Sequence, residues 1–454
     1  MIKEIVENQR NYYTTGATRS ITFRLQQLRK FEKLIQKNET ELNAAIYADF
    51  KKSPFDNYTN ELALVLGEIK QARKKLKRWA RPKKVRTNFI NFPAKSYVIP
   101  EPLGVSLVIG AWNYPYQLSL GPAVAAMAAG NTIIIKPSEL PSHTSAAMAQ
   151  LINENFDPNY FKVVEGGIPE TTELLDQKFD KIFFTGSGNV GRIVYQAAAK
   201  HLTPVTLELG GKSPAFISKN CNLKMSVRRL VWAKFLNSGQ TCIAPDYILV
   251  DKVIEEQFLE MVRAEIEASH LSVENENYVQ IINDRNLDRL EALIDPDKLY
   301  YGGKIDRKNR ILEPTVMHNI SFDDKVMEDE IFGPILPVIS YNNLNEAIEW
   351  VKKLPKPLSC YAFTNQKAEK EKILAEISFG GGGINEAVMH ITNDHLPFGG
   401  VGSSGTGAYH GVHGFKAFSH YKSVLDKPTW FETNLKYYPH SAKKFKWIRR
   451  IQNL

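Results

Sequence analysis

Apolar side chains alternate with charged and polar ones at helical spacing along the first eighty residues. Between 25 and 35, leucine, phenylalanine and isoleucine recur every three or four positions, the period of an amphipathic helix. Asn38 with Glu41 three residues later is typical of a helix start, and a further helix is predicted over 62–79. The chain therefore opens with a helical region.

The pattern changes between 83 and 100. Residues 86–93 and 96–99 alternate in the manner of strands, and they precede the main run of buried elements. We expect this excursion to form a protruding hairpin.

A regular alternation of strands and helices follows. Short apolar runs predict five strands, at 105–109, 132–135, 162–164, 182–184 and 205–207. Amphipathic stretches between them predict helices at 118–127, 142–152 and 190–199. This order is typical of a parallel, doubly wound sheet. After Gly210-Gly211, a helix at 227–236 and a strand at 247–250 begin a second α/β segment.

The composition is that of an ordinary globular protein with more than one domain. The chain has 454 residues, 43% of them hydrophobic and 24% charged, which predicts two or three domains. Its three cysteines, Cys221, Cys242 and Cys360, are widely spaced and form no C-x-x-C pair. A disulfide framework and a metal site are therefore not expected, and a reducing, cytoplasmic setting fits best.

Two features raise the question of a membrane or nucleic-acid partner. Residues 102–135 carry no charge, but asparagine, glutamine and proline interrupt the stretch, so buried strands and a packed helix explain it better than a span. The net charge is +9, with a basic run at 443–450 that includes Phe445 and Trp447. No nucleic-acid motif accompanies it. The run is either a solvated tail or a contact with an anionic membrane, peripheral and at the inner surface.

Cys242 stands at the end of the most informative segment, Gly239-Gln-Thr-Cys242, which is followed by a break at Pro245. Small polar neighbours suit a nucleophile whose sulfur and backbone amide must stay accessible. Taken alone, a free cysteine is more often a small buried residue.

Two segments could bind a dinucleotide. Gly186-Ser187-Gly188-Asn-Val-Gly191 matches G-x-G-x-x-G after a predicted strand and before a predicted helix. Glu208 lies about where such a motif expects its ribose-binding acid. A second ribose site is possible at Lys136-Pro-Ser-Glu139, at the end of another strand. Without a nucleotide, these segments would be a glycine turn and a solvated turn.

Seven segments in order carry a specific resemblance. They are Gly110–Pro115, Lys136–Glu139, Phe184–Ser187, Leu207–Pro214, Gly239–Cys242, Glu330–Pro334 and Pro397–Gly405. Together they resemble the aldehyde dehydrogenase superfamily over essentially the whole chain, and the segment from Trp232 to Cys242 is similar to its class 3 branch, which handles fatty and aromatic aldehydes.

The resemblance implies an α/β fold with three parts and a tail. An atypical Rossmann cofactor domain would comprise 1–83 and 101–209, and an α/β catalytic domain 210–417. A small β bridging arm, 84–100 with 418–428, would join the subunits of a homodimer. Residues 429–454 would form a basic C-terminal tail.

The resemblance also implies roles for the site residues. Cys242 would attack the aldehyde, Asn113 would stabilise the oxyanion, and Glu208 would activate the water that hydrolyses the thioester, with Glu330 as the second candidate base. The residues expected to bind NAD or NADP are Lys136, Glu139, Gly186, Ser187, Glu330 and Phe332. Glu139 favours NAD, because a carboxylate repels a 2′-phosphate, but class 3 enzymes often accept both.

Four aromatic residues match the family's aldehyde tunnel: Trp112, Tyr114, Trp232 and Phe398. They favour an apolar substrate, such as a long-chain, aromatic or terpenoid aldehyde; the alternative for each is an ordinary core aromatic. Two rival functions stay open. One is a CoA-acylating dehydrogenase, which commonly lacks the hydrolytic glutamate. The other is a non-catalytic structural or binding relative, which would lack the nucleophile or the cofactor residues.

Overall fold

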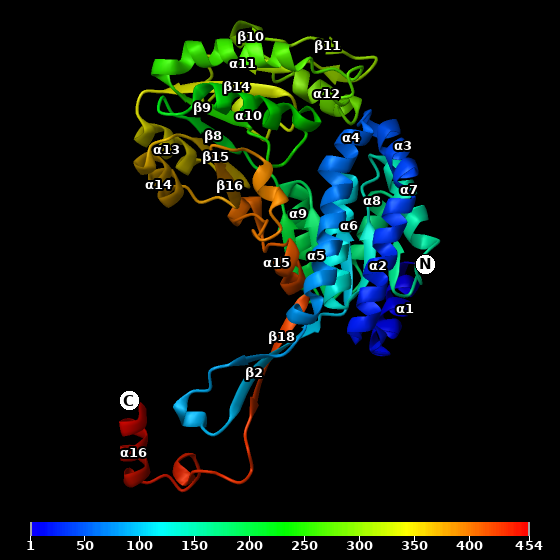
Figure 1. Cartoon of the computed structure of the whole chain (residues 1–454), viewed down its shortest axis with the longest axis vertical. Coiled ribbons are helices and arrows are strands. Elements are labelled where there is room, and N and C mark those ends of the chain that lie inside the picture. Colours follow the sequence, from blue (N-terminus) through cyan, green and yellow to red (C-terminus); the bar gives the residue numbers. More distant parts are fainter. Residues whose placement is uncertain (1, 453–454) are drawn as a thin grey trace.

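Two central sheets with their helices and one extended arm make up the computed structural model, which describes residues 2–452. In Figure 1 the N-terminal helices and the first sheet lie on one side and the second sheet lies above them. The arm projects away from both, with the C-terminal helix beyond it. The α/β fold class is as the sequence predicts.

The first sheet has six strands in the order β17-β7-β6-β3-β4-β5. All neighbours pair in parallel except β17, which is antiparallel to β7. The strands β3, β4 and β6 are buried along their whole length, as their valine, isoleucine and phenylalanine runs require. The bounds are β3 (Val105–Ile109), β4 (Thr132–Lys136), β5 (Phe161–Val163), β6 (Lys181–Thr185), β7 (Val205–Glu208) and β17 (Gly405–Thr406).

Helices cover this sheet, and the most buried of them is α6 (Pro115–Ala129), every residue of which is buried. This helix lies in the uncharged stretch 102–135, so the absence of charge there reflects burial inside the protein. The other helices are α1 (Ile2–Thr14), α2 (Ile21–Lys37), α3 (Glu39–Phe50), α4 (Pro54–Asn57), α5 (Ala63–Trp79), α7 (Ser142–Asn153), α8 (Ile168–Leu175), α9 (Gly188–Ala199) and α15 (Gly411–Ala417). A π-helical turn, Tyr58–Leu62, leads into α5.

The second sheet has seven strands in the order β10-β13-β14-β9-β8-β15-β16, and only β10 is antiparallel. Its strands are β8 (Pro214–Ile217), β9 (Tyr247–Asp251), β10 (Leu299–Tyr301), β13 (Thr315–Met317), β14 (Ile335–Tyr341), β15 (Ser359–Phe363) and β16 (Gly381–Ile384). Its helices are α10 (Leu223–Phe235), α11 (Glu255–Ser269), α12 (Asp284–Glu291), α13 (Leu344–Lys353) and α14 (Lys367–Glu376). A separate ribbon pairs β11 (Ile305–Asp306) with β12 (Ile311–Leu312).

The arm is a three-stranded antiparallel sheet of β1 (Lys83–Val85), β2 (Lys95–Pro102) and β18 (Ser419–Asp426). Eight residue pairs join β18 to β2, from Ser419 opposite Pro102 to Asp426 opposite Lys95. The loop between β1 and β2 exposes Phe89, Ile90 and Phe92. In Figure 1 the final helix, α16 (Ala442–Gln452), lies past the end of this arm.

The chain returns to the first sheet earlier than the sequence suggests. Residues 405–406, which we expected within the catalytic segment 210–417, add β17 to β7 of the first sheet, and α15 packs on α5 and α6. A two-residue strand has no periodicity of its own, so the sequence could not place it. Within residues 2–452, no helix combines the length and apolarity needed to cross a membrane.

Candidate active site

The loop that carries Cys242 is held in an unusual backbone conformation. After α10, Asn237 and Ser238 both adopt left-handed angles, with φ of 55° and 53°, and Gly239 follows with φ of 71°. A Cβ atom at Gly239 would lie 2.2 Å from the carbonyl oxygen of Gly333, so this position requires glycine on two counts. Left-handed backbone angles at residues other than glycine are strained, and they persist only where surrounding contacts fix the backbone.

Those contacts come from the segment 279–282. The Ser238 hydroxyl donates to the carbonyl of Val279 at 2.6 Å, and the Gln240 amide donates to the carbonyl of Gln280 at 3.0 Å. The Gln240 side-chain oxygen accepts from the Ile282 N–H at 3.1 Å. The polar residues of the cysteine segment therefore fix the loop against the segment 279–282.

Glu208 ends β7 directly opposite Cys242. The thiol of Cys242 donates to Oε1 of Glu208 at 3.6 Å, and the Thr185 hydroxyl donates to Oε2 at 3.2 Å. Glu208 is 1% exposed, and this burial raises the pKa of its carboxyl to about 7, although its hydrogen bonds oppose the shift. A carboxyl with that pKa can both accept and release a proton near neutral pH.

Cys242 is partly exposed and lines a cavity. Burial raises the pKa of the thiol well above its usual range, and the carboxylates of Glu208 and Glu330 raise it further. The resting side chain is therefore a neutral thiol. Glu208, 3.6 Å away, is the group placed to take its proton.

Asn113 lies on the loop before α6, and its backbone is fixed from two directions. Its carbonyl accepts from the Asn237 amide at 3.1 Å and from the Lys52 ammonium at 3.3 Å. Its side-chain nitrogen donates to the carbonyl of Gln240 at 3.1 Å, which uses one of the two hydrogens of that amide. The structure thus joins Asn113 to the cysteine loop with a donor to spare.

The ion pair that supports Asn113 was not predicted. Lys52 and Glu61, 1% and 0% exposed, pair at 2.7 Å, and the second Glu61 oxygen accepts from the N–H of Tyr116 at 2.8 Å. The carboxylate thereby caps the start of α6, while the ammonium lies 4.5 Å from the ring centre of Tyr114. Neither residue stands in a motif, since Lys52 lies in the short link between α3 and α4 and Glu61 in the π-helical turn before α5.

A cavity of about 330 Å³ leads to Cys242 and Glu208. Its walls are mostly apolar, and two of the four predicted aromatic residues, Tyr114 and Trp232, line it. Trp112 and Phe398 lie outside these walls. Trp112 packs edge-to-face on Phe332 at 5.2 Å, and the 4% exposed Phe398 stacks on His410 at 5.4 Å.

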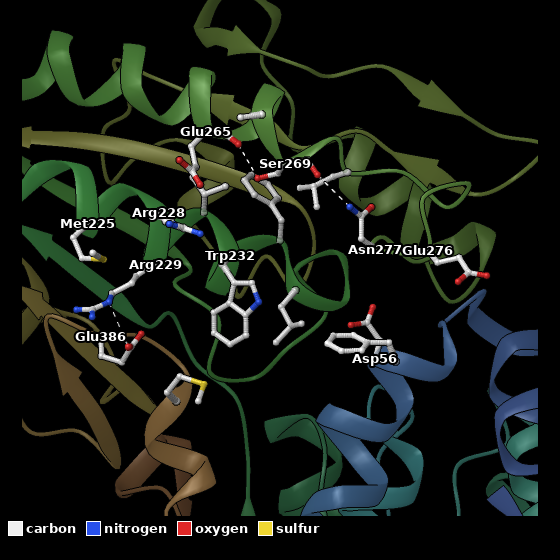
Figure 2. A pocket seen from close by; sticks show the side chains of 17 residues that line it. Asp56, Met225, Arg228, Arg229, Trp232, Glu265, Ser269, Glu276, Asn277 and Glu386 are labelled. Atoms are coloured by element: carbon white, nitrogen blue, oxygen red, sulfur yellow. Dashed lines mark hydrogen bonds and ion pairs between the residues drawn. The ribbon is translucent and has the colours of Figure 1, made fainter. Parts of the chain in front are cut away.

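The cavity continues into a wider outer groove of about 760 Å³. Five residues line both spaces: Phe55, Asp56, Trp232, Leu236 and Met389. Figure 2 shows Trp232 in the middle of the groove, between Asp56 on one side and Arg229 with Glu386 on the other. The rim is polar, and Trp232 lies where the groove and the cavity meet.

Lys136 and Glu139 lie at the carboxyl end of β4, the edge where parallel sheets bind ligands. Lys136 is 2% exposed and donates to the carbonyl of Pro137 at 2.6 Å, with Glu139 3.8 Å away. An ammonium has three hydrogens, so donor capacity remains. Burial lowers the pKa of Lys136, and the Glu139 carboxylate partly restores it. This buried, incompletely paired ammonium suits a hydroxylated ligand such as a ribose.

The glycine-rich turn adjoins the end of β7. The N–H of Gly186 donates to the carbonyl of Glu208 at 3.1 Å, and Ser187 caps α9 by accepting from the N–H of Val190. A Cβ at Gly188 would touch nothing, so the start of α9 is open to a ligand. At Gly191 a Cβ would lie 2.7 Å from Leu209, so this third glycine is required for packing.

Glu330 lies against the backbone where the chain leaves the first sheet. A Cβ at Gly210 would come within 1.9 Å of its carboxylate. Burial, with the Asp246 carboxylate, raises the pKa of Glu330 to about 8. Asp246 also pairs with Lys212 at 2.6 Å and accepts from the N–H of Ile331 at 2.9 Å. These two charged residues fix the Glu330 loop and were not singled out in the sequence.

A family model described as "Aldehyde dehydrogenase family" matches residues 1–424. The chain belongs to the aldehyde dehydrogenase family. It is 42% identical to the 4,4'-diaponeurosporen-aldehyde dehydrogenase of Staphylococcus aureus, covering 99% of this chain and 98% of that one. It is 45% identical to the dimeric NADP-preferring aldehyde dehydrogenase of Rattus norvegicus, covering 94% of each.

A solved structure supports the same family assignment. A substrate-bound state of the Staphylococcus aureus enzyme AldH superposes with a TM-score of 0.97 at 42% identity, over 100% of this chain and 99% of that one. The protein is therefore an oxidoreductase that acts on aldehydes and uses NAD or NADP. The buried Lys136 ammonium and the open start of α9 fit that cofactor.

Proposed function

We propose that this aldehyde dehydrogenase oxidises a long apolar aldehyde to its carboxylic acid through a thioester on Cys242. The observation that carries the proposal is the apolar cavity that ends at Cys242 and Glu208 and opens into the outer groove. At about 330 Å³ the cavity is near the small end of ligand pockets, which run from about 300 to 1,000 Å³. A long substrate would place its aldehyde inside and its remainder in the groove.

The first half-reaction needs a nucleophile and an oxyanion site. Glu208 takes the thiol proton of Cys242, and the sulfur attacks the aldehyde carbon to form a thiohemiacetal. The Asn113 amide, with its free hydrogen, and the backbone N–H of Cys242 would hold the oxyanion. Each such donor is worth about 3 kcal/mol of transition-state stabilisation.

NAD(P)+, when bound, would supply the acceptor for the hydride of the thiohemiacetal, which thereby becomes a thioester. Lys136 and Glu139 would hold the adenosine ribose, and Gly186 with Ser187 would lie beside the pyrophosphate. Glu330 would bind the nicotinamide ribose, and Phe332 would pack against the nicotinamide ring. We assign the six-stranded sheet with its helices to cofactor binding and the seven-stranded sheet to catalysis.

Once the proton taken from Cys242 has left it for solvent, Glu208 would act again as the base of the second half-reaction. Its carboxyl has a pKa of about 7 and lies 3.6 Å from the sulfur that carries the acyl group. A water between the carboxylate and the thioester would lose its proton to Glu208 as it attacks. Glu330 stays the second candidate for this base. Its carboxyl lies against Gly210, whereas that of Glu208 is hydrogen-bonded to the sulfur.

The presence of Glu208 also argues against transfer of the acyl group to CoA. The test is direct: purified enzyme, aldehyde and NAD+ should give acid and NADH without CoA. NADH formed only when CoA is added would establish the acylating alternative. A Cys242→Ala variant with wild-type turnover would end the nucleophile assignment and leave the non-catalytic relative as the better description.

The name of the Staphylococcus aureus relative supports a terpenoid aldehyde as one substrate. We propose that Trp232 selects for length, because it lines both the cavity and the groove. Removing this 44% exposed ring should cost about 1–2 kcal/mol of packing for a substrate that reaches it. Trp232→Ala should raise KM about tenfold for long aldehydes and leave short ones unchanged.

The control for this assay is Tyr47→Ala, which removes a 41% exposed aromatic ring that lines neither space. Equal effects of Trp232→Ala on aldehydes of three and sixteen carbons would contradict the assignment. Running the series with both NAD+ and NADP+ would also determine which cofactor is preferred.

We further propose that the enzyme is a homodimer joined through the arm. Phe89, Ile90 and Phe92 are 73%, 61% and 67% exposed there, which is unusual unless a partner covers them. A second proposal concerns α16, where Phe445 and Trp447 are exposed among basic residues and could meet an anionic membrane. Light scattering that shows a monomer would refute the homodimer. Absence of flotation with anionic liposomes at low salt would refute the membrane contact.

A further inference from the structure

A second, smaller cavity lies beside the substrate cavity. It has a volume of about 130 Å³, enough for several water molecules. Four residues line both cavities: Leu64, Gln117, Ile391 and Thr392. The remaining wall carries polar groups that the mechanism above does not use, chiefly Glu68, Tyr409 and His410.

Tyr409 connects this cavity to the catalytic base. Its ring is 3% exposed, and its backbone pairs with Phe398. Its hydroxyl is close enough to Glu208 to lower the pKa of that carboxyl. Yet among residues 2–452 it has no partner at normal hydrogen-bond geometry. A buried hydroxyl without a partner is unfavourable unless water satisfies it, and the cavity beside it has room for water.

Glu68 lies on α5 at the far wall of the same cavity. Both of its oxygens accept from the N–H of Gly411, at 3.0 and 3.1 Å, so it also caps the short helix α15. Two titratable groups are near it. The His410 Nδ1 atom lies 3.9 Å away but is neutral, since burial lowers its pKa to about 4, and Asp394 carries a like charge. Burial raises the pKa of Glu68 to about 7, so it can exchange protons near neutral pH.

The reaction itself requires a proton exit. Hydrolysis of the thioester forms a C–O bond to water, breaks the C–S bond, and yields the carboxylate, the Cys242 thiol and one proton. Glu208 receives that proton, but it is 1% exposed. The acyl chain would fill the apolar cavity and the cofactor would lie on the other side. The small cavity then offers a space lined with polar groups, and Tyr409 in its wall connects it to the base.

We propose that the small cavity is the proton exit for thioester hydrolysis, in which Tyr409 relays the proton from Glu208 to cavity water and Glu68 relays it on to solvent. Tyr409 accepts one proton as it donates its own, so it stays neutral. Water in the cavity completes the chain, and no oxidant or further reactant is needed. This inference rests on the proposed role of Glu208 as the base.

The test separates acylation from hydrolysis in single turnovers. Mixing enzyme, aldehyde and NAD+ gives a burst of NADH, and mass spectrometry of quenched samples gives the lifetime of the acyl-enzyme. Tyr409→Phe and Glu68→Gln should leave the burst rate within about twofold and slow hydrolysis about tenfold, since a positioned proton transfer contributes 10²–10⁴-fold and cavity water still leaks protons. A small acid such as formate should restore hydrolysis in Glu68→Ala.

Asp394→Asn is the matched control, because it removes a carboxylate from the same cavity without interrupting the path. If Glu68→Gln hydrolyses the acyl-enzyme at the wild-type rate, or if Asp394→Asn slows it equally, the relay is overturned. A burst of full amplitude shows that each variant is folded. Glu208→Gln separates the proposed base from the proposed proton exit. If Glu208→Gln hydrolyses the acyl-enzyme at the wild-type rate, the assignment of Glu208 as the base is overturned. If Glu208→Gln is slow but Glu68→Gln hydrolyses normally, only the proton exit is overturned.

Discussion

Replacing Glu208 with Gln should make Cys242 more reactive, even though it removes the proposed catalytic base. The Glu208 carboxylate lies 3.6 Å from the sulfur and disfavours a second negative charge there. Two unit charges at that separation repel by about 4–5 kcal/mol at an effective dielectric constant near 20, and by about 1 kcal/mol in water. The thiol faces a cavity open to solvent, so we take a repulsion of about 2 kcal/mol, which corresponds to a change of about 30-fold in the ionisation equilibrium of the thiol.

A lower thiol pKa changes reactivity in two opposite ways. The thiolate fraction rises about 30-fold, while the intrinsic nucleophilicity falls about fourfold, because it follows the pKa with a slope of about 0.4–0.5. We therefore expect Glu208→Gln to react with 2,2′-dithiodipyridine about 5–10 times faster than the wild type at pH 8.5. Below pH 6 the difference should vanish, since Glu208, with a pKa of about 7, is then neutral in the wild type.

The assay follows release of thiopyridone by stopped-flow absorbance. Both proteins should carry Cys221→Ser, because Cys221 is partly exposed, whereas Cys360 is buried. Slower modification of Glu208→Gln at pH 8.5 would refute the reasoning. It would mean that proton removal by the carboxylate accelerates the thiol more than its charge suppresses the thiolate.

Three further outcomes follow from the site. Lys52→Met leaves the Glu61 carboxylate buried without its partner, so stability should fall by about 3–5 kcal/mol, seen as a lower guanidinium midpoint by tryptophan fluorescence. Adding Glu61→Gln should restore part of that loss, and no recovery would contradict a charge effect. Gly239→Ala would bring a methyl group to 2.2 Å from the Gly333 carbonyl at φ 71°, so the NADH burst should disappear, and a normal burst would contradict the loop geometry. Acyl-enzyme hydrolysis should rise with pH through about 7 as Glu208 ionises and fall about tenfold per unit below it, whereas a flat rate between pH 5.5 and 8 would rule out that base.

The order of strands and helices in most of the first sheet could be predicted because their signals are local, whereas of the seven strands in the second sheet only β9 was predicted. Buried strands such as Thr132–Lys136 are continuous apolar runs, and the helices between them carry their own period. The segments around Cys242 and Glu208 could be found from short motifs for the same reason. The structure brings Glu208, at the end of β7, next to Cys242, on the loop between α10 and β9, at a separation of 34 in the sequence.

The supporting residues could not be found this way, because they act over long separations. Lys52 reaches Asn113 across 61 residues, and Glu68 reaches Gly411 across 343. In the sequence, lysines and glutamates on helices look alike whether they are solvated or buried. Likewise, the sequence could not distinguish Trp232, which lines the cavity, from Phe398, which packs against His410.

The two crossings between the sheets lie side by side. The chain leaves the first sheet after Glu208 and returns at Gly405, and these two residues are partners in the β7–β17 ladder. The N–H of Leu209 also donates to the carbonyl of Ser404 at 3.0 Å. The two sheets are therefore joined by a two-stranded antiparallel connection that includes Glu208 itself. A change in the angle between the sheets would bend this connection and would also reorient the Glu208 carboxylate.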